Sequence, residues 1–265
     1  MNNEIILLIP HFNNVSGLKK SLKSIGESEE IDVLIVDDGS KINIIEEDKI
    51  KFCFKAKGSV FFRYMKSNQG IEHALNDGLK FILNKKYNYT ARLDCGDLCN
   101  EFRFKKQLEF LKRNSDISLV GTNVKFYTPK HKFLFALSMP ESDKEIRKKM
   151  FLNAMFIHPT IMFANQILKK TGLYPTNYKA AEDFAFFFNV IKYYKVANIN
   201  EFLVDCELNS TGISTTQRKA QAKNRIKIIY NNFYFGFYPI YGLLRSVLLY
   251  FLPLWFLLFM KKFLK

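Results

Sequence analysis

Short apolar runs alternate with helical patterns along the first 100 residues of this chain. Ser16–Ile25 and Gly70–Leu83 carry apolar residues at helical spacing, with Leu18, Leu22 and Ile25 on one face of the first. Strands that alternate with helices predict a parallel sheet joined by right-handed crossovers. Four short, mainly apolar segments predict the buried strands: Ile5–Ile9, Val33–Val36, Val60–Met65 and Ala91–Leu93.

The chain beyond residue 100 continues the mixture. Helices are predicted over three segments: Glu101–Asn114, Asp143–Leu152 and Glu182–Tyr194. Strands are predicted over four: Ile117–Val120 and Asn123–Tyr127, on either side of Gly121, then Ile161–Phe163 and Phe202–Glu207. Gly212–Ser214 then marks a break into a basic helical segment. We therefore predict an α/β domain over residues 1–212 and a helical extension over residues 213–265.

The charge of the chain is concentrated near its end. The 265 residues are 48% hydrophobic and 25% charged, which is typical of a globular protein and argues against disorder. Of a net charge of +15, nine charges lie between residues 208 and 265, a stretch without Asp or Glu. This asymmetry predicts an anionic partner surface, either lipid headgroups or nucleic acid.

The end of the chain also carries an apolar run. Ser246–Met260 is uncharged, is interrupted by Pro253 and is flanked by Arg245 and Lys261. Because a membrane-spanning helix needs roughly 20 apolar residues, the run predicts a shallow or re-entrant membrane helix with basic residues on headgroups. The alternative is a helix packed on the protein's own core or on the partner subunit of a homodimer.

Cysteine usage and the first residues bear on the compartment. The four cysteines are too few and too scattered for a disulfide framework, and their spacing matches no zinc knuckle. Ile5–Ile9 is short and ends at Pro10 without a small-residue cleavage site, so no secretory signal is predicted. We expect a cytoplasmic protein with reduced thiols.

Three groups of acidic residues are the most informative chemical feature. Asp37 and Asp38 follow one predicted strand, and Asp94, with Asp97 three residues later, follows another. The carboxyl ends of parallel strands are where ligands bind, and gathered carboxylates repel unless they share a cation, a polyhydroxyl ligand or a proton. Glu182-Asp183 is the third group. Together they predict a site for sugars and metal-bound phosphates, although each turn taken alone is ordinary.

In order and spacing, these features resemble a family-2 glycosyltransferase of the GT-A fold. This family transfers a sugar from a nucleotide donor, usually with inversion at the anomeric carbon. The resemblance reaches from about residue 5 to 215, and its motifs are specific because they are collinear. They read LLIPHFNN, VLIVDDGS, SNQGIEHALNDGL, ARLDCGD, RFKKQLEFLKRNSDISLVGTNV, IHPTIMF and TGLYPTNYKAAEDFAFFFNV.

The resemblance implies a mostly parallel Rossmann-like sheet and a division of labour within it. Residues 1–100 would bind the nucleotide sugar, and residues 101–212 the acceptor. Asp183 matches the usual catalytic base, with Glu182 beside it; the alternative for this pair is a charge pair favoured by the helix dipole. The residues implied for donor binding are Pro10, Phe12, Asp37, Asp38, Asn68, Gly70, Arg92, Asp94 and Arg218.

At three places in the chain, the candidate residues also have a structural interpretation. Asn68–Gly70 is either a turn that faces the nucleotide or a helix cap. His158, before Pro159, either contacts the acceptor or diphosphate or satisfies a backbone carbonyl. Gln217 and Arg218 either close over the diphosphate as a lid or lie on a solvated basic helix.

Position 96 departs from the family pattern. Where many relatives have an Asp as the third residue of the Asp-X-Asp motif, this chain has Gly96, followed by Asp97. We expect Asp94 and Asp97 to hold Mg²⁺ or Mn²⁺ through oxygen ligands. The departure leaves open whether the missing carboxylate is replaced by Asp97.

The predicted function is therefore inverting transfer of a hexose or N-acetylhexosamine from a UDP-sugar to a hydroxyl of a glycan or glycolipid. The acceptor classes considered are lipooligosaccharide, capsule precursor and polyprenyl-linked glycan, at the cytoplasmic face of the membrane. A nucleic-acid-binding protein is an alternative, but acidic strand ends repel phosphates that carry no metal. A catalytically degenerate transferase that serves as a scaffold is the other, prompted by Gly96.

Overall fold

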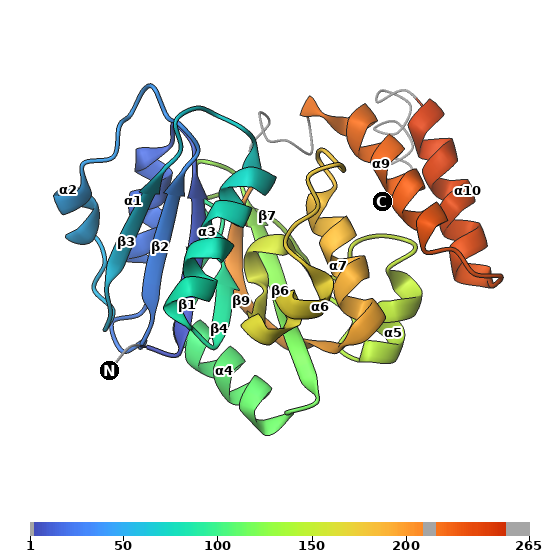
Figure 1. Cartoon of the computed structure of the whole chain (residues 1–265), viewed down its shortest axis with the longest axis horizontal. Coiled ribbons are helices and arrows are strands. Elements are labelled where there is room, and N and C mark those ends of the chain that lie inside the picture. Colours follow the sequence, from blue (N-terminus) through green and yellow to red (C-terminus); the bar gives the residue numbers. More distant parts are fainter. Residues whose placement is uncertain (1–2, 209–215, 253–265) are drawn as a thin grey trace.

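The computed structural model describes residues 3–208 and 216–252, and within them nine strands form one sheet (Figure 1). The strands are β1 (Ile5–His11), β2 (Asp32–Asp37), β3 (Val60–Tyr64), β4 (Tyr89–Arg92), β5 (Leu98–Cys99), β6 (Ile117–Tyr127), β7 (Phe133–Leu137), β8 (Met162–Ala164) and β9 (Lys195–Glu207). Each predicted strand overlaps an observed one, but β9 begins at Lys195 rather than Phe202, and the two strands predicted about Gly121 are the single strand β6. The short strands β5 and β7 were not predicted.

Helices cover the sheet and extend beyond it. They are α1 (Val15–Lys23), α2 (Glu47–Lys51), α3 (Ile71–Lys85), α4 (Arg103–Arg113), α5 (Asp143–Lys149), α6 (Leu168–Thr171), α7 (Glu182–Tyr193), α9 (Arg218–Asn231) and α10 (Phe237–Phe251), with 3₁₀ turns η1 (His158–Thr160) and η2 (Asn165–Ile167). The longer predicted helices are all present. The short α2 and α6 were not predicted.

The sheet is parallel in its first half and mixed in its second. Its order is β3-β2-β1-β4-β8-β6-β9-β5, with β7 paired to β6. The pairs among β1 to β4 are parallel, as are β6 and β9, whereas β8, β7 and β5 pair antiparallel. The expected mostly parallel sheet is thus corrected to a mixed one. Residues 128–132 are one cause, since so short a connection between β6 and β7 allows only antiparallel pairing.

The core has two layers, one on each face of the sheet. Alternate residues of β1 point to opposite faces, so Ile6 and Leu8 pack with α3 while Leu7 and Ile9 pack with α1 and α4. The Phe-rich helix α7 joins the first layer. Since both faces are covered, the strands are continuously apolar, which explains the pattern of short apolar runs in the sequence.

The strand β6 is continuous, although the sequence predicted two strands about Gly121. A Cβ atom at Gly121 would lie 2.2 Å from Oδ1 of Asn198 and 3.0 Å from the ring of Phe156. The glycine therefore makes room for a neighbouring side chain within a strand rather than a turn between two strands.

The C-terminal segment forms two helices that pack on each other and, through α9, on α7. Figure 1 shows α9 and α10 at the end of the molecule away from β3. The predicted basic helical segment is confirmed by α9. The predicted break at Gly212–Ser214 and most of the apolar run, from Pro253 onward, lie outside the described residues. Within residues 3–208 and 216–252, no helix has the length and apolar content that a membrane crossing requires.

Replacing Gly121 tests the close packing at β6. Asn198 donates to the carbonyls of Pro140 and Met155, so a methyl group at position 121 must displace an amide that holds two hydrogen bonds. We expect Gly121→Ala to lower the free energy of unfolding by about 2–4 kcal/mol, measured by urea denaturation. Gly26→Ala is the control, because its Cβ would meet nothing closer than 3.7 Å. Equal stability of the two variants would contradict this packing.

Candidate functional site

A cavity of about 850 Å³ lies where β1, β2 and β4 end. Six residues predicted for the donor line it: Pro10, Phe12, Asp38, Asn68, Gly70 and Asp94. Gln69 and Gln217, which the sequence offered as part of a nucleotide-facing turn and of a lid, also line it. Its remaining lining residues were not predicted as donor ligands: His11, Asn14, Ile71, Glu72, Ala74, Cys95, Lys179 and Ala180. The carboxyl ends of the parallel strands therefore open into one space, as the position of the acidic groups suggested.

Asp38 holds one wall of the cavity in place. Its two carboxylate oxygens accept hydrogen bonds from the backbone N–H groups of Gln69 (2.8 Å) and Gly70 (2.9 Å). Gly39 has a φ of +70°, and a Cβ there would lie 2.4 Å from the carbonyl carbon of Ser67. The two turns are thus locked against each other, and burial raises the pKa of Asp38.

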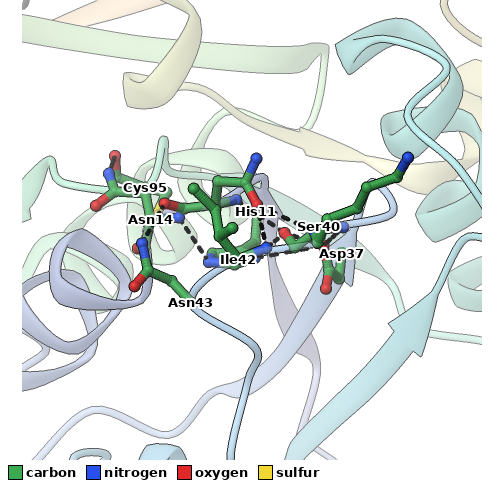
Figure 2. Close-up of polar contacts among 9 residues, drawn as sticks. His11, Asn14, Asp37, Ser40, Ile42, Asn43 and Cys95 are labelled. Carbon is green, nitrogen blue, oxygen red and sulfur yellow. Dashed lines mark hydrogen bonds and ion pairs between the residues drawn. The ribbon is translucent and has the colours of Figure 1, made fainter.

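Asp37 turns away from the cavity and supports the loop beneath it. Its Oδ1 accepts from the hydroxyl (2.6 Å) and the backbone N–H (3.0 Å) of Ser40, and lies 3.5 Å from Nδ1 of His11. His11 Nε2 accepts from the backbone N–H of Asn14 (3.1 Å), so a neutral ring carries its proton on Nδ1, toward Asp37. Figure 2 shows these side chains turned toward one another. Of the Asp pair, only Asp38 borders the cavity.

Arg92 is buried behind Asp94 rather than exposed to a ligand. Its side chain is fully buried, and its Nη2 donates to Asp94 Oδ1 at 2.6 Å. Nη1 donates to the carbonyls of Leu8 (3.0 Å) and Leu93 (3.3 Å). The guanidinium thus fixes the Asp94 carboxylate at the edge of the cavity, where its side chain is about two-fifths exposed. The structure gives Arg92 a positioning role instead of the predicted direct donor contact.

His158 lies on the far side of Arg92 and is buried. Its Nε2 accepts from Tyr174 Oη (2.8 Å) and lies 3.4 Å from Nε of Arg92, which can only donate. Burial and the positive charge of Arg92 hold the pKa of His158 well below its usual value. The ring is therefore neutral and accepts hydrogen bonds. Its contacts fit a structural role for His158, although its partners are the side chains of Arg92 and Tyr174 and not the predicted backbone carbonyl.

The helix α7 begins beside the cavity and carries the third acidic pair. Glu182 is buried, and its Oε2 has no hydrogen-bond partner among the described residues. Burial, with the nearby charge of Asp183, raises the pKa of Glu182 to about 8. The charges of Glu72 and Asp94 act in the same direction. Acidic groups from β4, α3 and α7 are thus close enough to perturb one another.

Asp183 has a different environment from its neighbour. Its Oδ1 accepts from the backbone N–H of Phe184 at 2.6 Å. Burial raises the pKa of Asp183, and the guanidinium of Arg225 on α9 opposes this. Arg225 itself lies over the ring of Phe184 and donates to Oδ1 of Asn153 (2.8 Å). The sequence argument had counted Arg225 only as part of the basic tail, and no local motif marks its proximity to Asp183.

Asp97 is a structural residue in this geometry. Its Oδ1 accepts from the backbone N–H of Glu207 at 2.8 Å, and its carbonyl accepts from Ser21 Oγ at 2.8 Å. Burial raises the pKa of Asp97 to about 8. It lines a smaller neighbouring space of about 240 Å³ together with Asp94.

A divalent cation needs several oxygen, nitrogen or sulfur ligands that converge on one point. Among the described residues, no group of three or more His, Cys, Asp or Glu side chains is arranged to hold a metal ion. Oδ1 of Asp97 is bonded to the backbone of β9, which leaves its second carboxylate oxygen for the predicted ligand role. Asp94 fits, as an oxygen ligand that reaches the cavity.

The two candidates at the start of α9 lie apart. Gln217 lines the cavity, whereas Arg218 donates from Nη2 to the carbonyls of Leu249 (2.9 Å) and Leu252 (3.0 Å) at the end of α10. Gln217 is the residue that precedes the first turn of α9. Of the two residues that the sequence offered as a lid over the diphosphate, Gln217 lines the cavity and Arg218 does not.

Comparison with known proteins assigns this geometry to a family. The model of the family described as glycosyl transferase family 2 matches residues 6–172. The chain belongs to glycosyl transferase family 2. This membership and the GT-A fold confirm the two predictions made from the collinear motifs.

The relatives of this family-2 chain are distant. It is 25% identical over 223 residues to the bifunctional glycosyltransferase pgtA of Dictyostelium discoideum, covering 71% of this chain and 29% of the relative. It is 28% identical over 137 residues to the O-antigen biosynthesis glycosyltransferase WbnJ of Escherichia coli, covering 51% and 52%. The chain thus matches about a third to a half of the length of such curated relatives.

Solved structures share the fold of the family-2 chain. TarS of S. aureus superposes with a TM-score of 0.62 at 16% identity, covering 87% of this chain and 66% of that one. The mannosyltransferase PcManGT of Pyrobaculum calidifontis, solved with GDP-Man and Mn²⁺, gives 0.62 at 13% identity, covering 93% and 69%. At this identity the likeness concerns the fold.

The raised pKa of Glu182 predicts a pH dependence of stability. Its folded-state pKa of about 8 lies above the ordinary 4.5, so folding favours the protonated carboxyl. That contribution is fully present below about pH 4.5 and is lost as the pH rises through about 8. We expect Glu182→Gln to be more stable than the wild type at pH 8.5, by at least about 1 kcal/mol, and similar to it at pH 5.

Urea denaturation at several pH values measures this difference. The control is Glu27→Gln, which changes an exposed carboxylate and should leave the pH dependence unaltered. If the free energy of unfolding depended on pH in the same way in the wild type and in Glu182→Gln, the carboxyl of Glu182 would not be kept protonated by burial.

Proposed function

We propose that this chain transfers a hexose or N-acetylhexosamine from a UDP-sugar to a hydroxyl group of an acceptor, with inversion. The observation that carries the proposal is that Asp94, which lines the cavity, is close enough to Glu182 and Asp183 at the start of α7 to perturb their pKa values. The cavity itself offers polar backbone and the Phe12 ring for a nucleoside. The adjoining acidic group offers carboxylates for sugar hydroxyls and for proton transfer.

The donor is assigned to the cavity at the strand ends. The Phe12 ring, 46% exposed, offers a stacking surface, and the turn held by Asp38 offers backbone groups for a base and ribose. UDP is supported by TarS, which has been solved with UDP and with UDP-GlcNAc. Gln217 then lies where it can contact the donor from α9.

We propose that the chain binds a divalent cation, with Asp94 as the protein ligand. Mg²⁺ or Mn²⁺, held by this carboxylate together with the phosphates of the donor, would offset the charge that the leaving diphosphate develops. The Mn²⁺ in the PcManGT complex supports this assignment. Arg92 contributes by holding the Asp94 carboxylate in one orientation.

Asp183 is proposed as the base that accepts the proton of the attacking hydroxyl. Burial raises its pKa, which makes its carboxylate a stronger base than an exposed aspartate. Its Oδ1 is bonded to a backbone N–H, which fixes the direction of the carboxylate. Attack from the face opposite the leaving diphosphate inverts the anomeric carbon.

The acceptor is proposed to be a glycan or glycolipid at the cytoplasmic membrane face. The O-antigen transferase named among the relatives supports a lipid-linked glycan, such as a lipooligosaccharide, a capsule precursor or a polyprenyl-linked chain. The basic C-terminal helices support a position near anionic headgroups. The acidic surroundings of the cavity disfavour a nucleic-acid ligand.

A donor screen tests the proposal. Purified chain is incubated with UDP- and GDP-sugars and a mixture of glycan acceptors, and release of nucleoside diphosphate is measured with and without Mn²⁺. We expect release from a UDP-sugar, and a smaller rate without Mn²⁺. Release from no nucleotide sugar, together with no detectable UDP binding by calorimetry, would overturn the proposal.

Replacing the base separates catalysis from binding. We expect Asp183→Asn to lower kcat by roughly 10²–10⁴-fold while the dissociation constant for UDP changes little, because the carboxylate acts on the acceptor. Asp116→Asn, at an exposed aspartate paired with Lys195, is the control and should keep full activity. Equal activity of Asp183→Asn and wild type would refute the assignment. Turnover by the wild type that this variant loses would exclude a purely scaffolding role.

A further inference from the structure

The residues that helix α10 buries are small, and most of its large apolar residues are exposed, although Tyr238 and Leu243 pack on the core. Its buried positions are Pro239, Gly242 and Ser246. A Cβ atom at Gly242 would lie 2.2 Å from the carbonyl oxygen of Phe151, so the helix backbone packs directly on that segment. A surface helix of a water-soluble protein has the opposite arrangement, with its apolar stripe toward the core.

The outward face of α10 forms a continuous apolar stripe. Its residues recur at intervals of three and four, the spacing of one helix face, and Leu244 and Phe251 are 65% and 75% exposed. Arg245, the charged residue of α10, does not interrupt the stripe, since its Nη1 donates to the carbonyl of Leu152 at 2.7 Å. The outward stripe comprises Phe237, Ile240, Tyr241, Leu244, Leu248 and Phe251.

The neighbouring helix adds positive charge. Lys219, Lys223 and Lys227 are exposed on α9 at intervals of four, and residues 208–265 contain no Asp or Glu. The apolar stripe thus belongs to a C-terminal segment whose charged residues are all basic, which is complementary to an anionic lipid surface. A second copy of the chain would present the same positive charge to this face, which opposes a symmetric pairing.

The length of α10 decides how it would lie. Fifteen residues rise about 22 Å, which is shorter than the roughly 30 Å hydrocarbon core of a bilayer. A helix that is too short to span, and apolar along one exposed face, lies in the plane of the interface.

We propose that the outward stripe of α10 inserts into the surface of an anionic bilayer, with the three lysines of α9 against the headgroups. The chain then docks by a folded helix face, in addition to any contribution of the apolar residues after Leu252. The inference rests on the proposed function in one respect: docking to a bilayer would bring the chain to a lipid-linked acceptor.

Sedimentation of the full-length chain with vesicles tests the proposal. The double variant Leu244→Ser/Phe251→Ser removes two exposed residues of the stripe. Its control, Ile44→Ser/Phe52→Ser, removes residues of similar size that are 70% and 76% exposed elsewhere on the molecule. With vesicles of phosphatidylglycerol and phosphatidylcholine, we expect the first variant to lose at least about tenfold in partitioning, and the control to bind as the wild type does.

A charge variant provides a second, independent measurement. Lys219→Gln/Lys223→Gln/Lys227→Gln should weaken binding to the phosphatidylglycerol vesicles and leave the weaker binding to pure phosphatidylcholine unchanged. Because these side chains are exposed, the variant keeps its fold and stays informative even if the stripe variant does not fold.

Two results would overturn the proposal. One is wild-type vesicle binding by both the stripe and the charge variants. The other is a wild-type dimer, seen by light scattering without vesicles, that the stripe variant converts to monomer while vesicle binding persists. Release of nucleoside diphosphate with a soluble acceptor should be equal in all these proteins, so a failure of docking is distinguishable from a failure of the proposed transferase activity.

Discussion

The contact between Arg92 and Asp94 is the constraint on which the site depends. A guanidinium that is fully buried must be paired, because an uncompensated charge inside a protein costs several kcal/mol. Arg92 meets this need with one carboxylate and two carbonyls, and these belong to β1 and to the segment after β4. A second buried guanidinium, that of Arg103, donates to the carbonyl of Arg92 itself at 2.7 Å. The acid at the cavity edge is therefore anchored from within the sheet.

Several buried carboxyl groups lie close to Asp94, and their mutual repulsion is unfavourable for folding. Glu182 is held near Glu72, Asp94 and Asp183, and its raised pKa records the repulsion and the loss of water. Such an arrangement is kept when a ligand, a cation or a proton relieves it. The groups that destabilise the folded chain at high pH are therefore the same groups that we propose for the transfer reaction.

The sequence predicted what depends on short-range pattern and missed what depends on distant packing. The strand ends and the first two acidic groups could be located because each of those strands is a continuous apolar run that stops at the acid. Glu182-Asp183 follows no strand and was recognised as a charged pair at a helix start and through the family resemblance. The hydrogen bond between Asp97 and the backbone of Glu207 could not be predicted, because the two residues are 110 positions apart in the sequence. Likewise, Gly121 marks no turn only because Asn198 from β9 occupies the space beside it.

The position of Arg225 connects the C-terminal helices electrostatically to the acidic pair at the start of α7. This side chain reaches from α9 to Asn153 and to the ring of Phe184, and its charge opposes the raised pKa of Asp183. The proton affinity of Asp183 is therefore tied to how tightly α9 sits on α7. A shift of that helix, by whatever force acts on the end of the chain, retunes the strength of the carboxylate without touching it.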